Sequence, residues 1–135
     1  MQGEINLHKI EVYNIARELS RESWNTFKTF EWHTRKIIGD QWITAIDSVG
    51  ANIAEAHGRF HYLDKIKFLY NARGSLYETL HWLGLMKERG IIAEAFFQKC
   101  NGMIQGLAPK LNRYIEAHYQ RKQINTNRKS SPLSG

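Results

Sequence analysis

The stretch of residues 48–77, near the middle of the sequence, restricts the possible folds most strongly. Residues 48–56 are mostly small or apolar, and residues 68–77 place apolar or aromatic side chains on nearly every side of a helix. Between them lies Gly58, which fits a helix end that needs a positive φ. Small residues let two helices approach closely, and a helix without a fully solvated side needs several packing partners. The stretch therefore predicts a helical hairpin at the centre of a bundle.

The composition fits one globular domain. The chain has 135 residues, of which 42% are hydrophobic and 24% charged, and it contains only two prolines. These values are typical of globular proteins, and the length suffices for a hydrophobic core. The sequence contains no run of about 18 apolar residues, so no membrane span is predicted. The polar N-terminus lacks the features of a signal peptide. Because the single cysteine cannot form an intrachain disulfide, we expect a cytoplasmic protein.

The spacing of apolar residues predicts four helices. They span residues 9–30, 41–57, 65–88 and 93–119. Short connections favour an all-α, antiparallel up-down-up-down four-helix bundle over residues 1–121. Pro109 lies inside the last pattern and predicts a kink or a break near residues 105–109. Residues 122–135 are polar and basic, and they predict a disordered tail.

Particular residues mark helix ends and core faces. Asp40 and Asp64 are expected to be the N-caps of the second and third helices, and Gly90 is expected to end the third. The predicted core face of the third helix comprises Ile66, Leu69, Arg73, Leu76, Leu80 and Leu83.

Arg73 on this face belongs to a polar motif in the hairpin. The motif comprises Asn52, Glu55, Arg73, Ser75 and Glu78. A buried arginine without a partner costs several kcal/mol. Two interpretations stay open: Arg73 forms a buried pair with Glu55 or Glu78 that fixes helix register, or the helix is rotated so that Arg73 faces solvent.

The positive charge is concentrated near the C-terminus. The net charge is +6, but residues 1–109 contain 13 basic and 12 acidic residues, whereas residues 110–135 contain six basic residues and one acidic residue. Such an end is a candidate contact for phosphates, and the alternative is a solubilising tail.

Seven basic residues are candidate nucleic-acid contacts. They are Arg59, Lys65, Lys67, Lys110, Arg113, Arg121 and Lys122. In an up-down-up-down bundle, the turn between the second and third helices lies at the same end as both termini, so the two groups can share that end. Phe60, His61 and Tyr62 at the turn can stack on bases. The alternative is an ordinary turn with solvated lysines.

No residue pattern predicts catalysis, a metal or a cofactor. Glu78 and His81 form one Glu-x-x-His motif, whereas a di-iron bundle uses two. His57 and His61 are separated by the predicted turn, so they do not share a helical face. Cys100 lies among apolar residues, where a free cysteine behaves as a small hydrophobe. We therefore expect a protein that is not an enzyme.

Four segments of the sequence resemble a known family. They are residues 16–19 (AREL), 48–56 (SVGANIAEA), 68–70 (FLY) and 72–78 (ARGSLYE). They resemble bacterial four-helix-bundle proteins encoded in intervening sequences of 23S ribosomal RNA genes. The same superfamily includes the accessory protein of diversity-generating retroelements. The resemblance covers about residues 9–115. It implies a homopentamer and nucleic-acid binding, with a reverse transcriptase as partner in the retroelement branch.

The aromatic content predicts self-association. Four tryptophans, six tyrosines and six phenylalanines exceed what a single bundle needs, and Trp24, Tyr70, Tyr77 and Trp82 lie outside the predicted core faces. Two functions stay open. The first is a non-enzymatic homo-oligomer that binds RNA or DNA, with structured RNA favoured, through one basic end. The second is a protein-interaction or scaffold module, for example an accessory subunit for a reverse transcriptase.

Overall fold

The computed structural model describes residues 4–130, with side chains up to residue 121. Four long helices form the molecule: α1 (Glu11–Phe27), α3 (Asp40–Gly58), α4 (Tyr62–Glu88) and α5 (Glu94–Ser130). A 3-10 turn, η1 (Leu7–Lys9), precedes α1. The short α2 (Trp32–Thr34) and the π-helical turn η2 (Arg35–Gly39) lead directly into α3.

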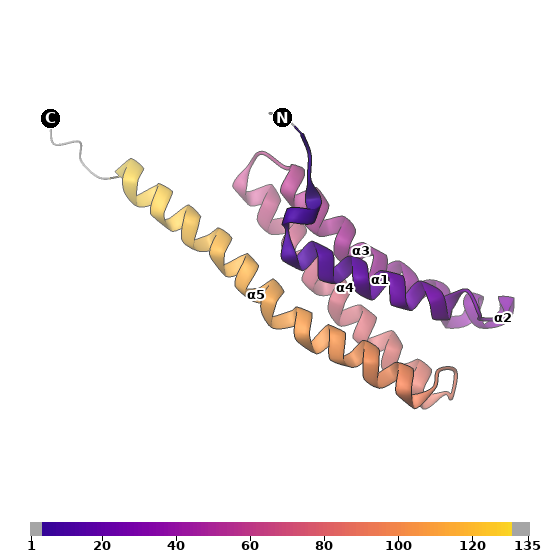
Figure 1. Ribbon diagram of the computed structural model, residues 1–135. Helices are drawn as coiled ribbons and strands as arrows, with labels where there is room; N and C mark the ends of the chain where they lie inside the picture. Colours follow the sequence, from indigo (N-terminus) through magenta and orange to yellow (C-terminus); the bar gives the residue numbers. More distant parts are fainter. Residues whose placement is uncertain (1–3, 131–135) are drawn as a thin grey trace, which may run out of the picture.

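The four long helices form an antiparallel bundle. Helix α3 packs against α1 and α4, and α5 packs against α4 and closes the bundle against α1. Figure 1 shows the α3–α4 turn at the same end of the bundle as the N-terminal residues, with the C-terminal end of α5 pointing in the same direction. The predicted up-down-up-down four-helix bundle is therefore confirmed.

The spacing of apolar residues within 9–30 and 41–57 also predicts the core faces of the first two long helices, and the burial of their residues agrees. The buried residues of α1 include Val12, Ala16, Leu19, Ser23 and Phe27, and those of α3 include Trp42, Ile46, Val49, Ile53 and Ala56. Both sets repeat at three- and four-residue steps, which keeps their side chains on one side of a helix. The spacing alone was sufficient here because the outward faces of both helices are clearly polar.

At two positions on the core face of α4, the buried residue is the one directly before the predicted residue. Ala72 and Thr79 are fully buried, whereas the predicted Arg73 and Leu80 are only partly buried. The hydroxyl of Thr79 donates to the Ser75 carbonyl at 2.8 Å within the same helix. A buried hydroxyl that is already hydrogen-bonded carries little desolvation cost. The helix can therefore bury Thr79 and leave Arg73 outside the core.

Helix α5 is longer than predicted and continues past Pro109 without a break. The carbonyl that proline deprives of a partner belongs to Gln105, and both residues are exposed, so water can solvate the freed group. The helix ends at Ser130 rather than near Tyr119, so residues 122–130, predicted to be disordered, are helical. The remaining tail residues, 131–135, lie outside the described part of the chain.

The helix ends show which capping predictions hold. Asp40 has helical dihedral angles and makes no cap, because η2 and α3 are continuous, and Asp64 lies within the first turn of α4 rather than before it. Gly58 is the last helical residue of α3 and does not have a positive φ. Gly90 does, with a φ of 68°, and the Ile91 N–H donates to the Met86 carbonyl at 2.9 Å. This pattern ends α4 as predicted.

Candidate nucleic-acid interface

The tip of the α3–α4 turn presents two exposed rings. Phe60 is 91% exposed, and the ring of His61 meets it edge-on at 5.4 Å. Tyr62, the third predicted stacking residue, is partly buried and packs edge-on against Tyr119 of α5 at 6.2 Å. Two of the three predicted rings are therefore accessible to a base.

Lys65 has a structural role at this turn. Its Nζ donates to the carbonyls of Ala56 and His57, both at 3.3 Å. These carbonyls belong to the last turn of α3, where carbonyls lack the usual helical partners, and the Ala56 carbonyl also accepts from the Arg59 N–H at 3.2 Å. A positive charge there also complements the negative end of the helix dipole. The ammonium of Lys65 is thus engaged within the chain.

Arg59 and Lys67 both lie near the ring of Phe68. The Arg59 guanidinium lies 4.8 Å from the Phe68 ring and forms an ion pair with Glu55 at 3.2 Å. The Lys67 ammonium lies 5.9 Å from the same ring and has no acidic partner within the described residues. Lys67 is therefore the more available cation of the two.

The basic residues of α5 likewise include one that is paired with an acid and others that are not. Lys110 pairs with Glu11 of α1 at 2.5 Å, and this contact lowers the pKa of the Glu11 carboxyl. Arg113 and Arg121 are exposed and form no ion pair in the part of the chain that is described, although Arg113 also helps to lower the pKa of the Glu11 carboxyl. The side chain of Lys122 lies outside that part.

A tyrosine cluster joins the start of α4 to the C-terminal part of α5. The hydroxyls of Tyr70 and Tyr119 are 2.8 Å apart, and this hydrogen bond is the main cause that raises the pKa of Tyr119 to about 12. Arg121 lies two residues beyond Tyr119 in α5. The cluster therefore brings the turn and the basic end of α5 to the same end of the bundle, as predicted.

The polar motif of the hairpin does not form the predicted buried pair. The Arg73 Nε donates to Asn112 Oδ1 of α5 at 3.0 Å, and its guanidinium lies 5.0 Å from the Tyr77 ring. The two acids have other partners: Glu55 pairs with Arg59, and Glu78 accepts from the Trp82 indole at 3.0 Å. Asn52 donates to its own helix at the Ser48 carbonyl. Arg73 is a surface link between α4 and α5, because Ala72 occupies the core position.

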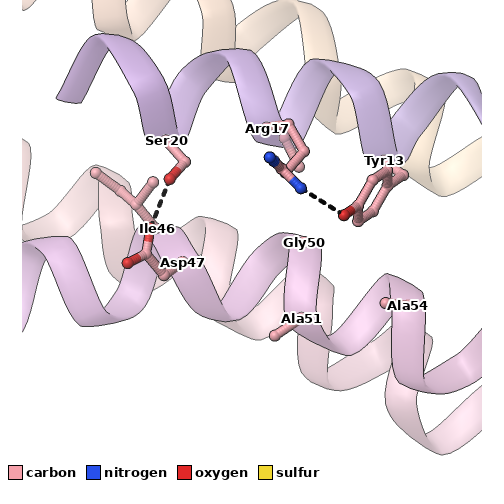
Figure 2. A pocket seen from close by; sticks show the side chains of 9 residues that line it. Tyr13, Arg17, Ser20, Ile46, Asp47, Gly50, Ala51 and Ala54 are labelled. Atoms are coloured by element: carbon pink, nitrogen blue, oxygen red, sulfur yellow. Dashed lines mark hydrogen bonds between the residues drawn. The ribbon is translucent and has the colours of Figure 1, made fainter. Parts of the chain in front are cut away.

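A groove between α1 and α3 was not predicted. It has a volume of about 370 Å³, and Gly50, Ala51 and Ala54 of α3 line one side. Figure 2 shows polar side chains of α1 along the other side, with the Ser20 hydroxyl donating to Asp47 at 2.6 Å and the Arg17 guanidinium donating to the Tyr13 hydroxyl at 2.8 Å. The small residues of α3 were visible in the sequence, but their neighbours on α1 were not.

Two further properties concern the described residues alone. They contain no cluster of three or more His, Cys, Asp or Glu side chains placed to hold a metal. Among them, no helix has the length and apolar character needed to cross a membrane.

Cys100 should be unreactive in the native protein. It is 1% exposed, its Sγ lies 3.9 Å from the buried Ser23 hydroxyl, and burial raises the pKa of its thiol. We expect its reaction with an aromatic disulfide reagent to be at least about 100-fold slower than in urea, because the thiolate is scarce and exposure requires local opening. Absorbance of the released thiol measures both rates. Equal rates in the native and unfolded protein would contradict the buried position.

Comparisons with known proteins agree on one group. Residues 8–113 match the family described as 23S rRNA-intervening sequence protein. A crystal structure from Bacteroides thetaiotaomicron, described as a protein with unknown function from the S23 ribosomal protein family, has a similar fold. Its TM-score is 0.72 at 24% identity, over 78% of this chain and 95% of that chain. No protein of curated function matches this chain.

Proposed function

The chain belongs to the 23S rRNA-intervening sequence protein family, and we propose that it is a non-enzymatic homo-oligomer that binds nucleic acid through its basic end. The observation that carries the proposal is the combination found at that end. The exposed ring of Phe60 lies at the turn, and Lys67, Arg113 and Arg121 have no acidic partner within the described residues. Exposed rings stack on bases, and free cations contact phosphates.

The internal contacts divide the predicted basic residues into two groups. Arg59, Lys65 and Lys110 are engaged with Glu55, the end of α3 and Glu11 respectively. Lys67, Arg113 and Arg121 therefore contribute most to binding in this proposal. Because a phosphate contact releases condensed counterions, their contribution should fall steeply as salt increases.

Self-association would multiply this modest charge. Trp24 and Trp32 are 52% and 72% exposed, and Tyr70 and Tyr77 of α4 are also exposed. Trp82 is partly buried and donates to Glu78, so it adds less to the surplus. Exposed apolar side chains of this size are typical of interfaces. A homopentamer, which the family resemblance implies, would present five basic ends together.

Neutralising the free cations should weaken binding and its salt dependence. A variant with Lys67→Gln, Arg113→Gln and Arg121→Gln is expected to bind a labelled RNA hairpin about 10-fold or more weakly. The slope of log affinity against log salt should fall by about one for each phosphate that the variant no longer neutralises. Fluorescence anisotropy at several salt concentrations measures both quantities, with Lys28→Gln, an exposed lysine at the other end of α1, as control.

The outcomes separate the two candidate functions. If the unchanged protein binds neither RNA nor DNA at low salt, the nucleic-acid proposal is wrong. The exposed Phe60 and Leu63, 76% exposed, would then favour the second candidate, a protein-interaction module such as an accessory subunit for a reverse transcriptase.

A further inference from the structure

Helix α5 extends well beyond the rest of the bundle. Tyr119 packs edge-on against Tyr62, the first residue of α4, so the start of α4 lies level with Tyr119. Helix α5 continues for 11 further residues, to Ser130 (130 − 119), which at about 1.5 Å per residue is about 16 Å. Figure 1 shows this yellow end of α5 standing clear of α1, α3 and α4. We call residues 121–130 the α5 arm.

The α5 arm is strongly basic. Residues 117–130 contain four lysine or arginine residues and no aspartate or glutamate. The acid that precedes them, Glu116, is five residues from Arg121, whereas charges pair along a helix at spacings of three or four residues. The positive charge of the arm is therefore not neutralised by acids of its own helix.

The arm continues the side of α5 that packs on the bundle. Within the bundle, the buried residues of α5 recur at three- and four-residue steps, and they are Cys100, Ile104, Leu107, Leu111 and Ile115. Positions 118, 122, 125 and 129 extend the same steps to the end of the helix. Positions with this spacing lie on one side of a helix. This side of α5 therefore changes from apolar to basic and polar where the bundle ends.

Five positions of the arm form a pattern that suits a groove. Arg121 and Arg128 are seven residues apart, as are Lys122 and Lys129. Seven residues make almost two helical turns, so each pair lies along one edge of the same side of the helix. Asn125 is three or four residues from all four and lies between the two pairs. A helix in a groove needs this order, because phosphates line both edges of the groove and base edges lie between them.

The helical form of the arm favours one kind of nucleic acid. The major groove of B-form DNA is about 12 Å wide and admits an α-helix. The major groove of A-form RNA is deep and narrow, and side chains cannot read it. A continuous helix with two basic edges therefore fits a DNA duplex better than an RNA duplex.

We infer that the α5 arm lies in the major groove of double-stranded DNA. The arginine pair contacts the phosphates of one strand, the lysine pair contacts those of the other strand, and Asn125 lies at the base edges. Asparagine pairs with N6 and N7 of adenine, so A·T pairs are the expected contact. The inference rests on the proposed nucleic-acid binding and names its ligand and the element that binds it.

Moving two lysines around the helix tests the inference at constant composition. One variant exchanges Lys122 with Gln123 and Lys129 with Ser130, which moves both charges by about 100° around the helix axis. We expect this variant to bind a labelled DNA duplex about 10-fold or more weakly, as measured by fluorescence anisotropy at fixed salt. Exchange of Arg128 with Lys129 keeps a charge at both positions and should leave the affinity unchanged. Circular dichroism and light scattering verify that the fold and the mass are unaltered.

Asn125→Ala tests the contact with the bases. We expect the unchanged protein to bind a duplex that contains A·T pairs about 10-fold more tightly than a duplex of G·C pairs alone. Asn125→Ala should bind both duplexes alike. Equal affinity of the unchanged protein for the two duplexes would contradict the position of Asn125 in the groove.

The other outcomes separate the inference from the proposed function. A protein that binds neither RNA nor DNA would overturn both. A lysine-exchange variant with unchanged affinity for DNA would overturn the inference alone, because positive charge on any side of the helix would then suffice. Tighter binding to an RNA duplex than to a DNA duplex of the same sequence would also overturn the inference, while it would support the proposed function.

Discussion

Replacing Trp42 with alanine should lower the free energy of unfolding by about 3–5 kcal/mol, the typical cost of truncating a buried aromatic side chain. Trp42 has no exposed surface, lies 6.0 Å from Phe30 and meets Phe96 edge-on at 5.9 Å. It joins α3 to the turn that follows α1 and to α5, so the cavity left by alanine would open where these elements meet. Urea denaturation followed by circular dichroism measures the change, at one fixed protein concentration because the proposed self-association would contribute to stability.

Trp42→Phe separates ring packing from the indole N–H. The Trp42 Nε1 is buried without a hydrogen-bond partner among the described residues. An unsatisfied buried donor costs about 1–3 kcal/mol, and phenylalanine removes it while retaining an aromatic ring. We therefore expect Trp42→Phe to destabilise far less than Trp42→Ala. Equal losses for both variants would show that the indole N–H is satisfied or that ring packing contributes little.

Alanine at Gly39 should destabilise the protein by about 1–2 kcal/mol. A Cβ there would lie 3.0 Å from Phe30 Cδ2 and 3.3 Å from Phe27 Cε2. These rings have little room to move, because Phe27 stacks on Trp24 and Phe30 lies against Trp42. Overpacking of this kind costs about 1–3 kcal/mol, and the gain in helix propensity offsets only about 1 kcal/mol of it. Thermal and urea denaturation measure the net change.

The same substitution at Gly50 is the matched control and should have the opposite sign. A Cβ at Gly50 would lie 3.8 Å from the Ala16 Cβ and 3.9 Å from Tyr13 Cε1, which are ordinary contact distances. Gly50→Ala is therefore expected to stabilise the protein by up to about 1 kcal/mol through helix propensity. If both variants change stability by the same amount and sign, close packing does not distinguish the two glycines.

The sequence by itself determined the number, order and direction of the long helices. Their apolar residues repeat at helical spacing, and Gly90 ends α4 as its position predicts. It also determined the core faces of α1 and α3, because polar residues occupy the opposite sides of those helices. The sequence likewise indicated that the α3–α4 turn and the basic part of α5 lie at one end, since antiparallel helices with short connections leave no other arrangement.

Only the tertiary structure decided how α4 is rotated about its own axis and which basic side chains have partners. Apolar and aromatic residues surround α4, so its spacing favours several rotations almost equally, and the burial of Ala72 and Thr79 selects one of them. The partners of Lys65 and Lys110 are distant in the sequence or lie in the backbone, so spacing within one helix cannot reveal them. The α1–α3 groove likewise depends on which residues of α1 lie opposite Gly50, and packing between helices fixes that.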